Sequence, residues 1–125
     1  MNEIETQEQL DYLTASNPVV VDFYAPWCGP CRSLMPVVEQ LADENSDVII
    51  VKCNIDDAPD LAGSMGVSAI PCIKFLSVGG AVNSTSVGIS TKVKLQGKID
   101  ALRSSGPEIS QEASEFIEEF EAETE

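Results

Sequence analysis

Two cysteines separated by two residues are the most reactive groups in this sequence. Cys28 and Cys31 lie in the run WCGPC at 27–31, after an apolar stretch at 19–24 and before a helical pattern. A strand ending before Cys28 and a helix beginning near Pro30 would place Cys28 at the helix N-terminus, where unpaired N–H groups and the helix dipole stabilise a thiolate. Cys31, about one turn later, could then attack a mixed disulfide formed on Cys28. The spacing therefore predicts dithiol–disulfide exchange.

The same pair could instead form half of a zinc site, which needs two further ligands. The other two cysteines, Cys53 and Cys72, are single and separated in the sequence, and the chain contains no histidine. Histidine-dependent metal sites and catalytic dyads are therefore excluded, and we expect no bound metal. We interpret Cys53, in an apolar segment, as a small buried hydrophobe. Cys72 could be equally inert, or could exchange with the reactive pair if it were exposed enough to form a thiolate.

Composition narrows the class of protein. The 125 residues are 43% hydrophobic, enough for one domain with a core, and 21 acidic against seven basic residues give a net charge of −14. Such a chain repels nucleic acid phosphates and anionic lipid. It has no apolar run of about 18 residues that could span a membrane, and its acidic N-terminal residues do not resemble a signal peptide. We therefore expect a cytoplasmic protein whose cysteines serve catalysis rather than structural disulfides.

Apolar periodicity predicts the elements that position the cysteines. Strands are expected at 2–5, 19–24, 48–53, 72–78 and 81–87, and helices at 6–13, 30–44, 59–65 and around Leu95, Ile99 and Leu102. The strands at 19–24 and 48–53 are apolar on both faces, as in the middle of a parallel sheet, and the helix between them forms a crossover. Gly79 and Gly80 indicate a hairpin, and Gly106, followed by proline, ends the last helix.

The pattern divides the chain into an α/β domain at 1–106 and an acidic C-terminal extension at 107–125. The extension carries eight glutamates and no basic residue. Its apolar residues recur at helical spacing: Ile109, Ala113, Phe116 and Phe120. Glutamates four apart weaken an isolated helix by roughly a few tenths of a kcal/mol each. A helix here therefore needs the domain or a partner to cover its apolar face, and the alternative is a solvated tail. We expect an accessory role for it.

A carboxylate interrupts the buried strand that precedes the cysteines. Asp22 is costly there unless the chemistry requires it. Burial raises the pKa of a carboxylic acid toward the range that a base needs near neutral pH, so we interpret Asp22 as functional. The alternative is a satisfied polar residue at a strand end.

Together these residues resemble the thioredoxin family over roughly residues 2–105. The motifs that carry the resemblance are VDFYAPWCGPC at 21–31, KCNID at 52–56, GVSAIP at 66–71, and Gly88. A lone C-x-x-C is weak evidence, whereas WCGPC between a strand and a helix, followed by Ile-Pro and by a glycine after a hairpin, is specific. The resemblance implies a thioredoxin fold, with a central mixed β-sheet flanked by helices. Two features depart from the family pattern: Cys72 replaces the usual threonine, and the acidic extension follows Ser105.

The resemblance also implies a role for each matching position. Cys28 would be the attacking thiol and Cys31 the resolving thiol, and the two would form the redox-active disulfide. Asp22 would accept the Cys31 proton and Lys52 would be its partner on the adjacent strand, although ordinary snorkelling of Lys52 is an alternative. Pro71 would be a cis-proline facing the disulfide. The residues expected to contact the substrate chain are Trp27, Gly29, Pro30, Ala69, Ile70, Val87, Gly88 and Ile89.

The implied function is reduction of protein disulfides in redox homeostasis. No bound cofactor is expected, and electrons would come from NADPH through a flavin-containing thioredoxin reductase. The partners would be this reductase and disulfide-containing proteins, with no nucleic acid or membrane, and the protein would be a monomer. Gly29 and Pro30 between the cysteines resemble the reducing members, whereas oxidising and isomerising relatives usually carry a histidine there. Two alternatives stay open: a scaffold subunit with incidental turnover, which a reductase-coupled assay separates, and an oxidase or isomerase, which the reduction potential separates.

Overall fold

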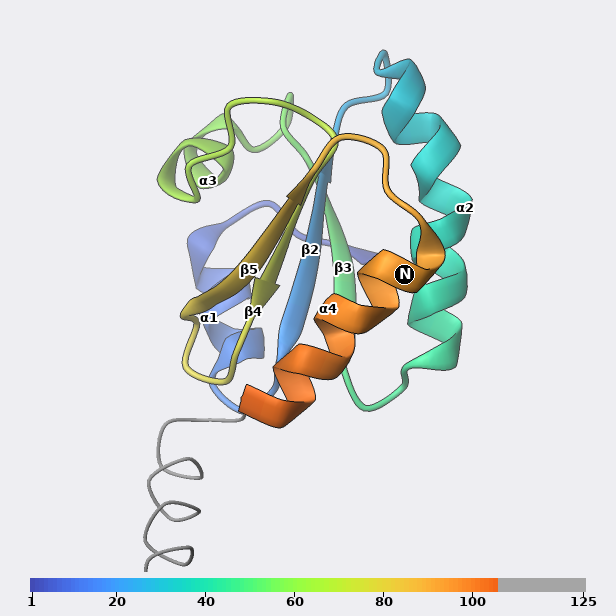
Figure 1. Ribbon diagram of the computed structural model, residues 1–125. Coiled ribbons are helices and arrows are strands. Elements are labelled where there is room, and N and C mark those ends of the chain that lie inside the picture. Colours follow the sequence, from blue (N-terminus) through green and yellow to red (C-terminus); the bar gives the residue numbers. More distant parts are fainter. Residues whose placement is uncertain (106–125) are drawn as a thin grey trace, which may run out of the picture.

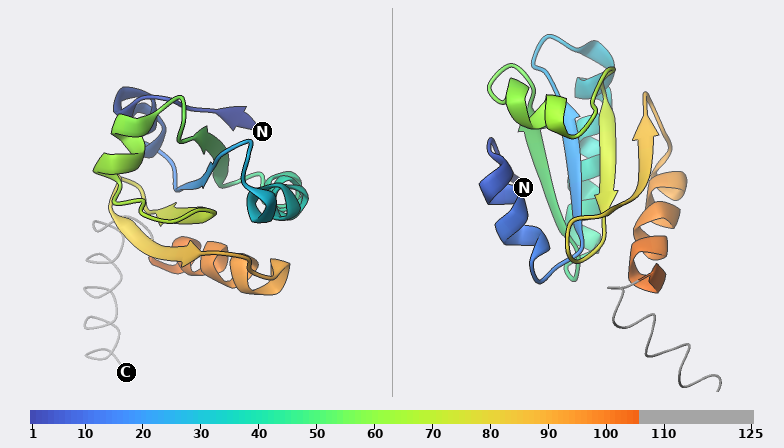
Figure 2. Two further views of the ribbon diagram at one scale, coloured as in Figure 1. Left: turned by 90° about the horizontal axis from the view of Figure 1, so that it is seen from above. Right: turned by 90° about the vertical axis from the view of Figure 1, so that its left-hand side faces the viewer.

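The computed structural model describes residues 1–105. Five strands form one mixed sheet in the order β1-β3-β2-β4-β5, with helices on both faces (Figure 1, Figure 2). Along the chain the elements are β1 (Asn2–Glu3), α1 (Gln7–Thr14), β2 (Val19–Tyr24), α2 (Gly29–Glu44), β3 (Ile49–Asn54), α3 (Pro59–Ser64), β4 (Cys72–Leu76), β5 (Val82–Val87) and α4 (Lys92–Ser105). None of the helices in this part of the chain is long and apolar enough to cross a membrane. The expected extension at 107–125 and the helix stop at Gly106 lie outside the described residues.

β2 is the central strand of the sheet. It pairs in parallel with β3 and antiparallel with β4, so that Asp22 lies opposite both Lys52 and Ile73. Five of the six residues of β2 are buried, because helices cover both faces of the sheet. The expectation of a buried strand at 19–24, joined through a helix to a parallel neighbour, is confirmed.

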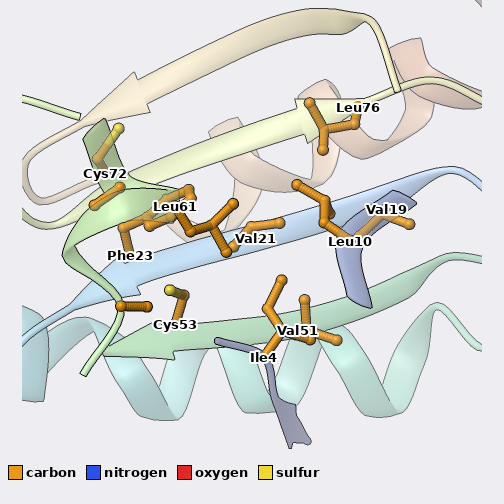
Figure 3. Close-up of a cluster of buried hydrophobic side chains, with 12 residues drawn as sticks. Ile4, Leu10, Val19, Val21, Phe23, Val51, Cys53, Leu61, Cys72 and Leu76 are labelled. Atoms are coloured by element: carbon orange, nitrogen blue, oxygen red, sulfur yellow. The ribbon is translucent and has the colours of Figure 1, made fainter. Parts of the chain in front are cut away.

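Alternate residues of β2 divide the core into two layers. Phe23 packs with Leu10 of α1 and Leu61 of α3, in the cluster drawn in Figure 3. Val20 packs on the opposite face with α2 and α4, against Leu34, Val38, Leu41, Leu95, Ile99 and Leu102. Asp22 points to the same face as Val20, because side chains alternate along a strand. The carboxyl group therefore faces the helix that begins at the cysteines.

Signals that are local in the sequence determine several of the element boundaries. The Gln9 N–H donates to the Thr6 hydroxyl at 3.1 Å, and the Gln9 side chain accepts from the Thr6 N–H, also at 3.1 Å. This reciprocal pair is a capping box, and it starts α1. Gly79 and Gly80 have φ values of 99° and 94°, a region that a tight hairpin turn needs and that glycine adopts without strain. The hairpin predicted at Gly79 and Gly80 is confirmed.

Removal of residues 107–125 is expected to leave the domain folded. Each long helix within residues 1–105 already buries its apolar face against the sheet, so both layers of the core are complete without the extension. A chain that ends at Gly106 should unfold cooperatively, with a thermal midpoint within roughly a few degrees of the full chain. It should also remain active in the reduction of a generic protein disulfide. Loss of cooperative unfolding would show instead that the extension belongs to the domain.

Candidate functional site

Cys28 caps the N-terminus of α2. Its backbone is extended, with φ −85° and ψ 109°, and its sulfur accepts a hydrogen bond from the Cys31 N–H at 3.2 Å. Pro30 suits the first turn of the helix, because the N–H that it lacks would be unpaired there. The free N–H groups and the dipole of α2 therefore act on the Cys28 sulfur and stabilise its thiolate form. The predicted placement of Cys28 is confirmed.

Cys28 and Cys31 are joined by a disulfide, and their Cα atoms lie 5.2 Å apart. Only 6% of Cys28 and 1% of Cys31 is exposed. The apolar side chains packed around the pair come from the end of β2 and from two loops: Tyr24, Ala25, Ile55 and Ile70. Cys31 is therefore the more completely covered member of the pair.

A cis-proline lies at the start of β4 next to this cluster. The Ile70-Pro71 peptide bond is cis, as the resemblance implies. The Gly88 N–H donates to the Pro71 carbonyl oxygen at 2.8 Å, which joins the end of β5 to the start of β4. Gly88 has a φ of 84°, so glycine suits this turn. Ile70 packs against the cysteine pair, and the structure therefore brings the motifs at 66–71 and 88 to the disulfide.

Large apolar side chains are exposed around the site. Trp27 is 67% exposed, and Val87 and Ile89 are each 62% exposed. Exposed apolar groups beside a reactive pair provide a surface on which another chain can dock. The other residues expected to contact substrate are exposed or half-buried: Gly29, Pro30, Ala69, Ile70 and Gly88. All the predicted contact residues are therefore available at the surface.

Two contacts that hold the loop before α2 were not predicted. The Trp27 indole N–H donates to the Asp56 carboxylate at 2.9 Å. The Arg32 guanidinium donates to the Pro26 carbonyl oxygen at 2.7 Å. Asp56 follows β3 as Trp27 follows β2, and neighbouring parallel strands end at the same edge of a sheet. The predicted parallel pairing of these two strands already indicates that the residues following them lie close together.

Asp22 is 1% exposed, and neither of its carboxylate oxygens has a hydrogen-bond partner among residues 1–105. Burial raises the pKa of Asp22 from 3.8 to about 7, while the positive charge of Lys52 acts in the opposite direction. The carboxyl group is therefore close to half-protonated near neutral pH, which suits a group that accepts and returns a proton. Within residues 1–105, no protein group thus satisfies the Asp22 carboxylate with a hydrogen bond.

Lys52 lies opposite Asp22 in the register of β2 and β3, but no hydrogen bond joins the two side chains. Its Nζ lies over the ring of Tyr24, 5.9 Å from the centroid, in a cation–π contact. The Tyr24 hydroxyl donates in turn to the Glu3 carboxylate of β1. The expected partnership of Lys52 with Asp22 is thus an electrostatic effect across the strand pair rather than a direct contact.

The remaining cysteines are buried on the face of the sheet covered by α1 and α3 (Figure 3). Cys53 and Cys72 lie on either side of Phe23 in the strand register. Burial raises the pKa of the Cys53 thiol to about 11, and burial also raises that of Cys72. Both thiols are therefore protonated and unreactive near neutral pH. Among residues 1–105, no three potential ligand side chains are grouped so that they could hold a metal ion.

Comparisons with known proteins agree with this geometry. The family model Thioredoxin matches residues 2–101. The chain is 43% identical over 93 residues to a thioredoxin of Chlorobaculum thiosulfatiphilum, covering 74% of this chain and 85% of the relative. It is 42% identical over 91 residues to thioredoxin 1 of Synechococcus elongatus, covering 72% and 84%. The structure of a mutant thioredoxin from Halobacterium salinarum is similar with a TM-score of 0.75 at 35% identity, covering 81% of this chain and 88% of that chain.

A disulfide that is partly accessible through a helix-capping cysteine can open by thiol attack and close again. The fold and this site therefore define a protein disulfide oxidoreductase that acts by dithiol–disulfide exchange. Within that class, the chain belongs to the thioredoxin family. The expected thioredoxin fold, with a mixed sheet flanked by helices, is confirmed.

Asp22→Asn is expected to stabilise the protein and slow its turnover. Because the pKa of Asp22 is near 7 in the folded protein, against an ordinary value of 3.8, the folded state holds this proton more tightly than the unfolded chain. The resulting stabilisation is complete below about pH 4 and is lost as the pH rises through about 7. The variant lacks this loss. The variant's free energy of unfolding should therefore exceed that of the natural protein by an amount that grows from about pH 4 to about pH 7 and reaches on the order of several kcal/mol.

Denaturant unfolding of both proteins across this pH range measures the effect. A variant that is less stable than the natural protein near neutral pH would contradict an unpaired carboxylate and would indicate that Asp22 is well paired.

Tyr24→Leu is expected to lower the pKa of Asp22. Without the aromatic ring, the Lys52 ammonium loses its cation–π contact and can approach the carboxyl group on the adjacent strand, which favours the charged form of Asp22 by on the order of one pKa unit. Titration of the Asp22 carboxyl group by NMR measures the shift. Tyr24→Phe keeps the ring and is the matched control. The same titration midpoint in the two variants would show that the ring does not hold Lys52 away.

Proposed function

We propose that this protein reduces disulfides in other proteins, with Cys28 as the attacking thiol and Cys31 as the resolving thiol. The observation that carries this proposal is the Cys28–Cys31 disulfide at the N-terminus of α2, with Cys28 as the more exposed member. An intact pair in this position favours turnover over a scaffold that only binds partners.

The exchange takes two steps. In the first, the Cys28 thiolate attacks one sulfur of the substrate disulfide, a mixed disulfide forms, and the other substrate sulfur leaves as a thiolate. In the second, the Cys31 thiolate attacks the Cys28 sulfur, which closes the Cys28–Cys31 disulfide and releases the second substrate thiolate. Two electrons thus pass from the cysteine pair to the substrate.

Asp22 would take the proton that Cys31 loses before the second step. Three observations support this role: the carboxyl group faces α2, it has no hydrogen-bond partner among residues 1–105, and its pKa lies near 7. A group with this pKa can accept a proton from a thiol and return it to water at neutral pH. Lys52 would adjust the same equilibrium through its charge, from its position over Tyr24.

The substrate chain would lie across the exposed rim of the site. Trp27, Val87 and Ile89 offer apolar contacts. The backbone around Ala69 and Pro71 would pair with the substrate in the manner of an added strand, as in relatives. Main-chain pairing accepts many sequences, so this mode of binding suits a general reductase.

Electrons would return to the pair from NADPH through a flavin-containing thioredoxin reductase, so the chain itself needs no bound cofactor. Gly29 and Pro30 between the cysteines support the reducing direction over oxidation or isomerisation. We propose that the protein is a monomer in the cytoplasm. The reducing environment there keeps a cysteine pair of this kind in its dithiol form.

Serine substitutions separate the roles of the two cysteines. Cys28→Ser should abolish disulfide reduction, because the attacking sulfur is lost. Cys31→Ser should stop after the first step and accumulate a mixed disulfide on Cys28, which mass spectrometry of the trapped species detects. Cys53→Ala, at a buried cysteine outside the pair, is the matched control and should turn over normally without trapping. Alkylation of the reduced protein near neutral pH that labelled Cys31 before Cys28 would reverse the assignment.

A further inference from the structure

A groove of about 750 Å³ lies between the edge strand β5 and α4. Five consecutive residues of the β5 segment, 83–87, line it. Because side chains alternate between the faces of a strand, a consecutive run of lining residues means that the backbone edge borders the groove. β5 is last in the sheet order, so its outer N–H and C=O groups have no strand partner among residues 1–105. One face of α4 forms the other wall: Lys94, Gly97, Lys98 and Ala101.

The two lysines of this wall differ from the other basic residues. Within residues 1–105, the ammonium groups of Lys94 and Lys98 make no ion pair or hydrogen bond. Each of the other five cationic side chains has a partner: Arg32 with Pro26, Lys52 with Tyr24, Lys74 with Thr85, Lys92 with Glu44, and Arg103 with Asp47 and Asp100. In the described part of the chain, two positive charges four residues apart thus lie without an ion pair beside an open strand edge.

The groove reaches the redox site. Val87 and Ile89 line one end of it. These are the same exposed side chains that the proposed function assigns to substrate binding, and Gly88 between them donates its N–H to Pro71. A segment that fills the whole groove therefore covers one side of the substrate rim.

We propose that this groove binds the acidic extension of the same chain, residues 107–125, and that the bound extension competes with substrate at Val87 and Ile89. The extension supplies eight glutamates and no basic residue to face the two free lysines. Its apolar residues, among them Phe116 and Phe120, would lie against the small side chains of α4. The competition rests on the proposed function, whereas the docking rests on the groove and its charges alone.

The geometry of the chain favours its own extension over another occupant. The extension begins two residues after α4 ends at Ser105, and α4 ends at the same end of the molecule as β5 begins (Figure 1, Figure 2). The chain can therefore reverse there and run back along β5. Residues 83–87 span roughly 16 Å at 3.3 Å per residue, so the 19 residues of the extension are long enough. A tethered segment is present at an effective concentration on the order of millimolar, which a free acidic chain rarely reaches.

Amide hydrogen exchange on the full chain measures docking without turnover. At low salt, we expect the amides of β5 that do not pair with β4 to be protected. Lys94→Gln combined with Lys98→Gln should speed their exchange about threefold or more, as should high salt, because the attraction is screened. Lys92→Gln, on the same helix but at a lysine already paired with Glu44, is the matched control and should leave this exchange unchanged. Amides of β2 report any change in global stability.

Two results would overturn the docking. One is equal exchange of the β5 amides in the natural protein and in the double lysine variant. The other is a pair of results: the β5 amides lose protection in the double lysine variant but keep full protection in the triple variant Glu115→Gln, Glu118→Gln and Glu119→Gln. The groove would then hold an acidic segment other than the extension. Protection that rises with protein concentration would assign the groove to the extension of a second copy, and intramolecular docking would be wrong.

Turnover tests the competition separately. The double lysine variant should raise kcat/KM for a folded protein substrate about twofold or more at low salt, by removing a competitor from the rim, and should not change it for a small-molecule disulfide. Unchanged turnover of the protein substrate, with lost protection of β5, would overturn the competition. Absence of turnover in every variant, with the exchange pattern intact, would instead contradict the proposed function.

Discussion

β2 pairs along almost its whole length with β3 on one side and β4 on the other, and the redox site depends on this register. Cys28 follows the end of β2, the cis-proline precedes β4, and Asp56 follows β3. The parallel and antiparallel pairings bring these three points to one edge of the sheet. A slip of one residue in this register would turn Asp22 away from α2 and would move each apolar side chain of β2 to the opposite face of the sheet. The packing of both faces therefore specifies the register strongly.

The site combines two opposing electrostatic environments within a short stretch of chain. At the N-terminus of α2, free N–H groups favour the negative form of the Cys28 sulfur. Beneath that helix, burial favours the neutral form of Asp22, and the positive charge of Lys52, which lies over Tyr24, acts in the opposite direction but is the smaller effect. The helix terminus thus favours the charged form of one group, and burial beneath the helix favours the neutral form of the other. Among residues 1–105 the carboxyl group has no hydrogen-bond partner, and its burial in this state lowers stability near neutral pH.

The four cysteines show how position determines the reactivity of one side-chain type. Cys28 gains its character from the helix terminus, and Cys31 from its closeness to Cys28. Cys53 and Cys72 lie in strands beside Phe23, where burial keeps their thiols protonated. Cys72 is next to the cis-proline in the chain, yet it points into the layer beneath α1 and α3. Adjacency in the sequence therefore does not place it in the redox site.

Local patterns in the sequence were sufficient to predict the strand, the helix start and the hairpin that frame the site. Apolar periodicity reports which face of an element is buried, and Thr6, Pro30 and the Gly79-Gly80 pair act within a few residues of their own positions. These signals, with the family motifs, were sufficient to locate the site at Cys28 and Cys31. The junction of strand and helix that holds the pair is determined by residues close to it in the sequence.

Contacts between residues far apart in the chain were decided only by the tertiary structure. The Lys52 ammonium lies over Tyr24, whose hydroxyl meets Glu3 from a two-residue edge strand, and the indole of Trp27 is held by Asp56. The sequence contains each of these side chains, but which of them meet depends on the order of strands in the sheet and on where each flexible side chain finds its partner. Asp22 is a further case: among residues 1–105 its carboxyl group is buried without a hydrogen bond, which depends on all the residues that pack around it and not on its neighbours in the sequence.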